Sequence, residues 1–285
     1  MKLSIITINR NNAAGLEKTL RSVVTQTCKD FEHIIIDGAS TDNSVEVIKR
    51  YVEDTNTPSS ITNNPSPFTH HQIKWISEPD KGIYNAMNKG IRMASGEYIQ
   101  ILNSADCLCD EFVVEKMFKA LADNNYPSLL YGNMIKVASD GGIVGKSGRV
   151  EYSLRQYYSS TMNHDCCYIK RSLFDEYGLY DESLKIVSDW KWFLQAIGLG
   201  NVKPVYVDLN VTLFDTNGIS ETNLELRNME RRQVLESVMP PAVLADYDKH
   251  AFDMVQMGRL RRHGWAYKMT WLLERCLFRF EKWKR

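Results

Sequence analysis

The chain has 285 residues, with 35 Lys and Arg, 35 Asp and Glu, and 44% hydrophobic residues. This composition is typical of a soluble globular protein, and the length suits one large α/β domain with a small appendage. A formal net charge of zero argues against nucleic acid as the main partner. The apolar runs fall short of the ~20 residues that a membrane-spanning helix requires.

The six cysteines show no zinc-binding spacing, and two of them are adjacent. We interpret them as reduced cytosolic thiols. The apolar stretch at residues 3–8 is too short for a secretory signal and runs directly into polar residues. We therefore expect a cytoplasmic protein. The cysteines are Cys28, Cys107, Cys109, Cys166, Cys167 and Cys276.

Short apolar runs alternate with amphipathic segments at the beginning of the chain. Residues 3–8 and 31–36 have the pattern of buried strands, and 14–25 and 44–52 that of helices. This β-α-β-α order predicts a parallel, right-handed, doubly wound sheet. The sequence has no G-x-G-x-x-G after the first strand and no P-loop, which weakens the case for a dinucleotide enzyme or a P-loop NTPase.

Polar side chains follow both of these strands. Asn9 and Arg10 come after the first, and residues 37–42 after the second. In open α/β sheets, ligands bind at the carboxyl ends of the strands. For Asp37, the first residue after a buried strand, we favour nucleotide contact over a turn role. For Asp42, near a helix start, we favour an N-cap.

The stretch from residue 76 to 109 is the most informative. Residues 82–94 have helical spacing of apolar side chains, and we expect Gly96 to end this helix in the left-handed conformation. Residues 98–102 have the pattern of a buried central strand. Asp106 follows that strand, where a carboxylate would face a ligand.

This stretch resembles the family 2 glycosyltransferases, nucleotide-sugar enzymes with the GT-A fold. The resemblance covers about residues 1–220 and implies a mixed α/β sheet with helices on both faces. The family pattern E-P-D-x-G-x-x-D/N-A-x-N-x-G, then G-E-Y and L-N-x-x-D, matches Glu78-Pro79-Asp80, Gly82, Asn85-Ala86, Asn88, Gly90, Gly96-Glu97-Tyr98, Leu102-Asn103 and Asp106.

The resemblance implies a nucleotide-sugar donor, with a UDP-sugar favoured. Lys81 is placed to meet a phosphate as a point charge, although a solvated helix-end lysine is an equal alternative. The residues that we assign to the nucleotide and donor are Thr7, Asn9, Arg10, Asp37, Ser40, Asp80, Lys81, Asn88, Asn103 and Ser104.

Asp106 is the metal candidate. In the resembled family the matching motif holds a divalent cation on the diphosphate, and hard oxygen ligands suit Mn²⁺ or Mg²⁺. Asn103 and Ala105 stand where many relatives carry further acids. The alternative is a turn acid on the surface.

The middle of the chain gives fewer signals. Residues 112–123 have the pattern of a helix, and 129–137 that of a strand. Gly132 within this strand indicates a bulge or the close approach of a ligand. Residues 140–142 indicate a hairpin turn, and residues 143–160 have no regular pattern.

A second match covers residues 164–195, where relatives show H-x-x-x-F/Y and later a D-W/Y/F dipeptide that opens a helix. By position alone Asp189 is an N-cap. The resemblance makes it the catalytic base that deprotonates the acceptor hydroxyl. We place His164 near the donor or acceptor sugar rather than in a structural role. Trp190 is either a wall of the acceptor site or part of the core.

The end of the chain has a strand pattern at 205–213 and a loop at 215–220. The loop resembles the family's G-G-I-S loop, with Asn217 in place of the first Gly, so Gly218 is assigned to the sugar site. We expect a catalytic domain at 1–240, with a donor half at 1–110 and an acceptor half at 111–240, and a helical tail at 241–285.

The tail is basic and aromatic. From residue 258 to 285 it has nine Lys or Arg and two Glu, a formal charge of +7. Such a helix suits an anionic membrane surface. Packing on the catalytic domain or on another subunit is the equal alternative.

The family resemblance implies an inverting glycosyltransferase that acts on a glycan or lipid-linked acceptor in surface polysaccharide synthesis. Two rivals remain. A sugar-phosphate nucleotidyltransferase would need a Gly-rich basic loop after the first strand, where the chain has residues 9–12. A non-catalytic nucleotide- or carbohydrate-binding relative fits the thinned acidic motif, but the retention of Asp189 argues against it.

Overall fold

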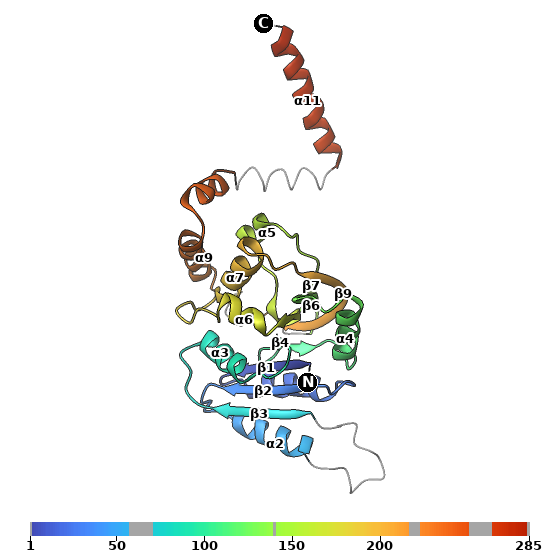
Figure 1. The fold of residues 1–285 in the computed structure, drawn as a ribbon, viewed down its shortest axis with the longest axis vertical. Helices are drawn as coiled ribbons and strands as arrows, with labels where there is room; N and C mark the ends of the chain where they lie inside the picture. Colours follow the sequence, from blue (N-terminus) through green and yellow to red (C-terminus); the bar gives the residue numbers. More distant parts are fainter. Residues whose placement is uncertain (1, 57–70, 139–140, 217–222, 251–263, 284–285) are drawn as a thin grey trace. The chain divides into compact units, whose positions relative to one another are not determined.

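The computed structural model describes residues 2–56, 71–138, 141–216, 223–250 and 264–283 (Figure 1). The chain forms two compact units, Met1–Arg232 and Gln233–Arg285, which are described separately. The larger unit is a mixed α/β structure with helices around a curled sheet, as predicted.

The first half of the larger unit is parallel. Four strands pair in the order β3-β2-β1-β4, all in parallel. β1, β2 and β4 are fully buried, mostly apolar runs that the sequence pattern predicts, whereas β3 is only partly buried. They and their helices are β1 (Leu3–Asn9), α1 (Ala13–Val24), β2 (Phe31–Asp37), α2 (Ser44–Asn56), β3 (Gln72–Ser77), α3 (Ile83–Met93) and β4 (Tyr98–Ile101). The predicted β-α-β-α order is confirmed.

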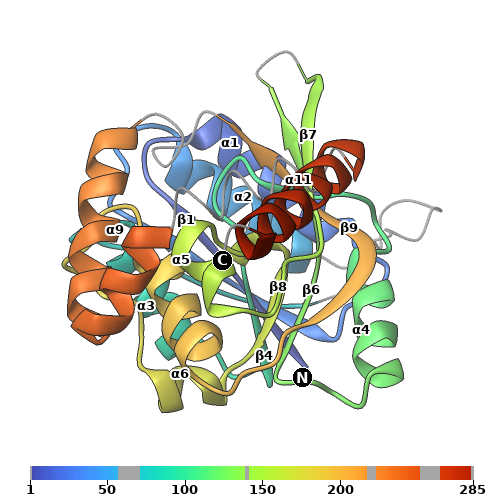
Figure 2. The same cartoon turned by 90° about the horizontal axis from the view of Figure 1, so that it is seen from above.

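The sheet then becomes mixed. β8 pairs antiparallel with both β4 and β6, β6 pairs parallel with β9, and β9 pairs antiparallel with β5. β7 forms a hairpin with β6 and projects from the sheet (Figure 2). The bounds are β5 (Cys107–Leu108), β6 (Leu129–Val137), β7 (Ile143–Ser147), β8 (Cys167–Lys170) and β9 (Val205–Asp215).

Helices complete the second half. Their bounds are α4 (Val113–Asp123), α5 (Leu154–Ser159), a 3₁₀ turn (His164–Cys166), α6 (Ser172–Tyr177), α7 (Ser188–Phe193), a π-helical turn (Leu194–Leu199) and α9 (Leu224–Val238). The expectation that residues 143–160 are irregular is wrong, because they contain β7 and α5. These elements are only five and six residues long, too short for a clear hydrophobic period.

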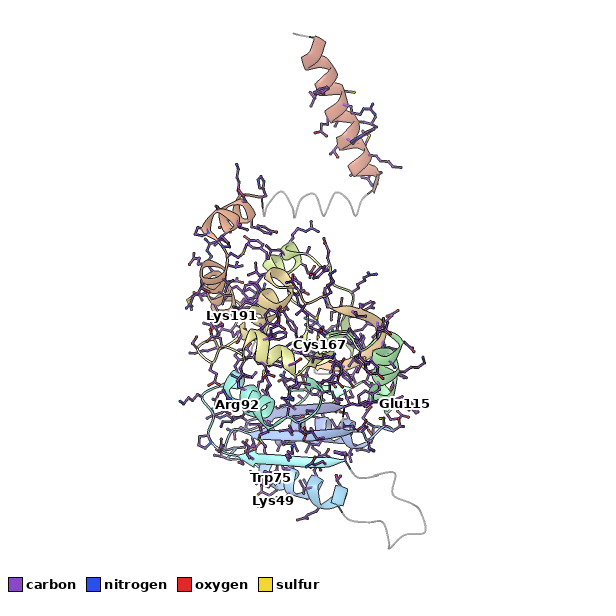
Figure 3. All side chains as sticks on the ribbon, in the orientation of Figure 1. Lys49, Trp75, Arg92, Glu115, Cys167 and Lys191 are labelled. Carbon is purple, nitrogen blue, oxygen red and sulfur yellow. The ribbon has the colours of Figure 1, made fainter. Side chains whose placement is uncertain are left out.

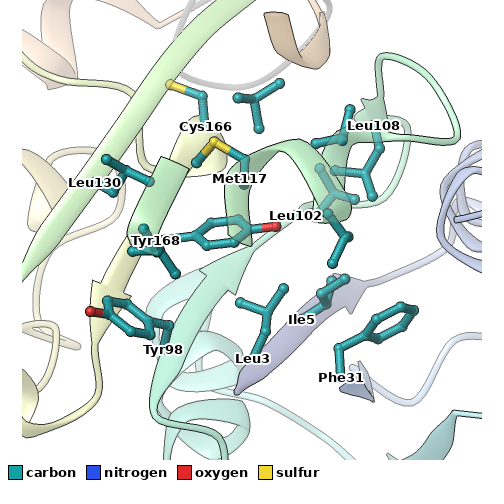
Figure 4. Packing of buried hydrophobic residues seen from close by; sticks show 14 of the residues in the cluster. Leu3, Ile5, Phe31, Tyr98, Leu102, Leu108, Met117, Leu130, Cys166 and Tyr168 are labelled. Carbon is teal, nitrogen blue, oxygen red and sulfur yellow. The ribbon is translucent and has the colours of Figure 1, made fainter. Parts of the chain in front are cut away.

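The core of the larger unit lies between β1, β4, α4 and β8. Leu3, Ile5, Leu102, Met117 and Tyr168 are all buried there (Figure 4). Cys167 is likewise interior, whereas Lys49, Arg92 and Glu115 lie at the surface (Figure 3). All six cysteines are free thiols.

The second unit contains α11 (Gly264–Trp283). Most of its described side chains are exposed, including Trp265, Trp271 and Phe278. Within the described part of the chain, no helix is long and apolar enough to cross a membrane.

Gly96 corrects one sequence inference. We expected a left-handed glycine at the end of α3, but only Gly82, Gly141 and Gly178 among the described glycines have a positive φ. Gly96 is required for a different reason. A Cβ there would lie 2.7 Å from the backbone of Leu3 and Ser4. The glycine lets the α3–β4 turn pack directly on β1.

Gly132 shows the same kind of constraint. A Cβ there would lie 2.6 Å from the carbonyl oxygen of Leu209 on β9. The β6–β9 register shifts between Tyr131 and Asn133, so the predicted bulge is confirmed. The close neighbour is another strand and not a ligand.

Replacing Gly96 with Ala tests this packing. Because the neighbouring atoms are backbone and cannot rotate away, we expect Gly96→Ala to lower the free energy of unfolding by roughly 1–3 kcal/mol. Urea denaturation followed by circular dichroism measures the change. Gly145→Ala is the control, since its Cβ would meet nothing nearer than 3.9 Å. Equal stability of the two variants would contradict the packing argument.

Candidate active site

The loops at the carboxyl ends of the parallel strands enclose a cavity of about 800 Å³. Its wall is formed by the loops after β1, β3 and β4, together with the 3₁₀ turn, α7 and the end of β9. This is the edge at which open α/β sheets bind ligands. Segments from most of the larger unit therefore meet around one space.

Asp189 lies on α7 and is held from two sides. His164 Nδ1 is 3.1 Å from its Oδ2, and the Tyr84 hydroxyl donates to its Oδ1 at 2.9 Å. Burial opposes ionisation of Asp189, but hydrogen bonding and charge from His164, together with the Tyr84 hydrogen bond, outweigh it, so the pKa of Asp189 is lowered. Val187 is the N-cap of α7, so the N-cap reading of Asp189 is wrong.

His164 is the cationic partner. Burial lowers the pKa of His164, but the hydrogen bond and charge of Asp189 outweigh burial and raise it to about 8. The ring is therefore an imidazolium at pH 7 and must donate from both nitrogens. Its Nε2 faces the Asn103 side-chain amide at 3.3 Å. The Asn103 side chain also hydrogen-bonds Asp106, which favours the charged form of that carboxyl and lowers its pKa.

Asp106 lies deeper in the cavity wall, with 3% of its surface exposed. Its Oδ1 accepts from the backbone N–H of Asp215 at 3.0 Å. Burial and the nearby charge of Asp165 raise the pKa of Asp106 against that hydrogen bond. The Thr19 hydroxyl on α1 accepts from the Ala105 N–H and donates to the Asp106 carbonyl, which fixes the loop.

The sequence analysis did not predict several residues of the cavity wall. Asp215 ends β9, and a carboxylate at a strand end is a signal that could have found it. Lys18 and Lys185 bring positive charge to the wall, and Tyr84 reaches Asp189. No local sequence pattern identifies Lys18, Lys185 and Tyr84, because they face the cavity only after the loops have assembled.

The structure brings eight of the predicted residues together and leaves others outside. The wall contains Asn9, Arg10, Asp80, Asn103, Ser104, Asp106, His164 and Asp189. The described residues that line the cavity do not include Thr7, Asp37, Ser40, Lys81, Asn88 and Trp190. Gly218 lies outside the described residues.

The predicted residues that do not line the cavity make contacts within the protein, and their binding roles stay predictions. Thr7 bonds His33 at 2.9 Å. The Asp37 carboxylate is fully buried and accepts from Asn9, Ser40 and Ser77. It therefore holds the loop that presents Asn9, and the nucleotide contact favoured from the sequence stays a prediction.

Asn88 and Trp190 are also structural here. Asn88 donates to the Tyr180 carbonyl and accepts from its N–H, which ties α3 to the segment before α7. The Trp190 indole donates to the Tyr157 carbonyl at 2.6 Å and is 1% exposed, which confirms its core reading. Lys81 is exposed.

Comparisons with known proteins agree with this geometry. The family model "Glycosyl transferase family 2" matches residues 4–178. An uncharacterized glycosyltransferase of Mycobacterium tuberculosis is 31% identical over 221 residues, which cover 76% of each chain. A PGL/p-HBAD biosynthesis glycosyltransferase of Mycobacterium bovis is 24% identical, over 80% of this chain and 82% of the relative.

Solved structures show the same fold. Staphylococcus aureus TarS 1–349 in complex with UDP has a TM-score of 0.61 at 18% identity, over 89% of this chain and 72% of that one. This chain covers 41% of a longer TarS chain. The mannosyltransferase PcManGT from Pyrobaculum calidifontis, in complex with GDP-Man and Mn²⁺, has a TM-score of 0.56 at 18% identity, over 81% of this chain and 61% of that one.

The fold is thus that of the GT-A glycosyltransferases. With a family model that spans more than half of its length, the chain belongs to glycosyl transferase family 2 and is a transferase enzyme.

The ion pair between His164 and Asp189 can be tested by titration. We expect the His164 ring to titrate near pH 8, because the ordinary histidine value of 6.5 is raised by Asp189. In Asp189→Asn the anion is lost while burial remains, so the pKa of His164 should fall, although Asp165 and Asp106 still raise it. NMR of ¹³C-labelled histidine measures both, and His164→Gln identifies the signal. A pKa that does not change in Asp189→Asn would contradict the pairing.

Proposed function

We propose that this protein is an inverting glycosyltransferase that moves a sugar from a UDP-sugar to a hydroxyl of a glycan or lipid-linked acceptor. The observation that supports it most is the placement of Asp106 and Asp189 in the wall of one cavity, far apart in sequence. Their surroundings differ, which suits two separate tasks.

Asp189 takes the role of general base. In the proposed displacement, the acceptor oxygen bonds to the anomeric carbon, the bond from that carbon to the diphosphate breaks, and the acceptor proton passes to Asp189. Such a base must be charged at neutral pH and within reach of the substrate. The lowered pKa of Asp189 and its position at the cavity meet both requirements.

The residues around Asp106 fit a small, hard divalent cation. Burial and the charge of Asp165 disfavour the ionised form of Asp106, which a bound cation would stabilise, and Asp215 adds a second acid to the wall. The described residues contain no group of three His, Cys, Asp or Glu suited to a metal. Mg²⁺ and Mn²⁺ take one or two carboxylates and complete their shell with phosphates and water. When bound, the ion would neutralise charge on the leaving diphosphate.

Cations and polar groups in the wall suit the rest of the donor. Arg10 is 63% exposed and its guanidinium lies 3.8 Å from Asp80, so it can move toward a phosphate at little cost. Lys18 and Lys185, which line the cavity, join Lys81 as candidates for diphosphate contact. Asn9, Asp80, Asn103 and Ser104 offer donors and acceptors for base, ribose and sugar. A TarS fragment of the same fold binds UDP-GlcNAc, which supports UDP as the first nucleotide to test.

Calorimetric titration with UDP tests the donor site. We expect binding that strengthens with Mn²⁺ and that weakens at least about tenfold in Asp106→Ala, since the ion loses its protein carboxylate. Asp189→Asn should bind UDP as the native chain does but release UDP from a UDP-sugar about 10²–10⁴-fold more slowly.

The matched control is Asp110→Ala. This nearby acid pairs with Lys116 at 2.8 Å at the surface and should leave UDP binding unchanged. Absence of UDP binding under all conditions would remove the UDP-sugar assignment. An equal loss in both alanine variants would remove the metal role of Asp106.

We also propose that α11 lies on an anionic membrane surface, where a lipid-linked acceptor would be found. The support is charge complementarity, since the tail carries a formal +7 from residue 258 to 285. Exposed apolar side chains accompany that charge, with Trp265 at 75%, Leu277 at 64% and Phe278 at 68%. Aromatic and basic side chains together favour the bilayer interface.

Vesicle co-sedimentation of the full chain tests this surface. We expect binding to vesicles of phosphatidylcholine with phosphatidylglycerol but little to phosphatidylcholine alone. Trp265→Ser combined with Trp271→Ser should weaken binding by on the order of tenfold, because buried aromatic area is lost. The control is Leu224→Ser with Met229→Ser, which removes exposed apolar residues of α9. Equal binding of both double variants would contradict the proposal, and a dimer in solution would favour a protein partner.

A further inference from the structure

Tyr84 reaches the candidate base from another part of the chain. It stands in the first turn of α3 and is 4% exposed. Its hydroxyl lies 2.9 Å from Asp189 Oδ1 and 2.6 Å from the carbonyl oxygen of Ile186. One O–H has a single proton, so these two oxygens share or exchange the same donor.

Burial alone does not explain the contact with Asp189. A buried tyrosine hydroxyl needs one partner, and the Ile186 carbonyl already provides it at the shorter distance. The neighbouring Tyr180, whose ring centroid is 5.7 Å from that of Tyr84, has a buried hydroxyl without any partner among the described residues. The Tyr84–Asp189 hydrogen bond is therefore an addition to what packing requires.

Resting on the function proposed above, we propose that Tyr84 is a positioning residue for the Asp189 base. His164 fixes Oδ2, and Tyr84 fixes Oδ1, so the carboxylate cannot rotate about its Cβ–Cγ bond. Its remaining lone pairs then keep one direction toward the cavity. A base held in one orientation meets the acceptor hydroxyl at lower entropic cost.

The Ile186 carbonyl is a second acceptor for the Tyr84 hydroxyl proton. While Asp189 is charged, its oxygen is the stronger acceptor for the Tyr84 proton. Once Asp189 has taken the acceptor proton, that attraction weakens, and the hydroxyl can donate to the Ile186 carbonyl. No buried donor is left unpaired in either state.

Other titratable groups lie near Asp189. His164 and Asp165 approach from the 3₁₀ turn and Arg231 from α9, and Lys185 lines the same cavity. The Tyr180 hydroxyl is neutral, because burial raises its pKa, and it contributes no charge. Most of these act through charge at a distance. Tyr84 and His164 are the side chains with hydrogen bonds to the carboxylate in the described structure.

The test is the pH dependence of UDP release from a UDP-sugar with water as the acceptor. The donor is whichever of UDP-glucose, UDP-galactose and UDP-GlcNAc the native chain hydrolyses fastest. In Tyr84→Phe we expect kcat to fall about tenfold and KM for the donor to stay unchanged, because one charge-assisted hydrogen bond is lost. Losing a donor to the ionised form raises the pKa of the base. The acidic limb should therefore move to higher pH, by about one unit.

Tyr180→Phe is the matched control, since it removes a hydroxyl from the same aromatic cluster but no hydrogen bond. Its acidic limb should stay in place. A second variant should shift the acidic limb in the opposite direction. Replacing Tyr84 with 3,5-difluorotyrosine gives a stronger hydrogen-bond donor and should move the limb to lower pH. The hydroxyl stays protonated there because burial and Asp189 raise the pKa of Tyr84.

The outcomes separate the two proposals. Native hydrolysis that depends on Asp189, with limbs unmoved in both position-84 variants, would overturn the role of Tyr84 alone. A limb that moves equally in Tyr180→Phe would do the same. Absence of native turnover with every UDP-sugar, or turnover that survives in Asp189→Asn, would overturn the proposed function instead.

Discussion

A continuous chain of hydrogen bonds crosses the floor of the cavity, and the elements around the cavity must be in place for it to form. It runs from Asn103 to His164, from His164 to Asp189, and from Asp189 to Tyr84. Its members stand on the loop after β4, the 3₁₀ turn, α7 and α3. Buried charges are tolerated only when paired and hydrogen-bonded, so a shift of any of these elements would leave a charge exposed to an apolar surrounding.

Side chains from α3 and α9 hold the segment before α7. Asn88 on α3 binds the backbone of Tyr180, and the Glu230 carboxylate on α9 accepts from the N–H groups of Lys185 and Ile186 at 2.7 and 2.9 Å. Arg231 also stacks over the Trp190 ring at 4.9 Å. The segment that leads into α7 and Asp189 is thus held by both α3 and α9, so residues outside the cavity help to fix the position of Asp189.

Local patterns in the sequence predicted the strands and helices, whose formation depends on the spacing of nearby apolar residues. The strands at Leu3–Asn9 and Phe31–Asp37 and the helix Ile83–Met93 were recognisable because burial imposes a period on the chain. The contacts of Asp37 with Ser77 and of Asn88 with Tyr180 could not be predicted, because these partners are distant in sequence. The roles of Tyr84 and Asp215 depend on the folded geometry in the same way.

The two acids of the cavity illustrate how surroundings divide labour between identical side chains. Asp189 accepts hydrogen bonds on both oxygens and faces an imidazolium, so its charged form is favoured without any ligand. Asp106 is buried beside the negative charge of Asp165, and these two effects outweigh the hydrogen bonds from Asp215 and Asn103 and the charge of His164, so its charged form is disfavoured until further positive charge arrives. A carboxylate that is always ionised suits proton transfer, and one that gains most from a cation suits the site where a metal and a diphosphate would meet. Exchanging the roles would require both surroundings to be rebuilt, because neither property belongs to aspartate itself.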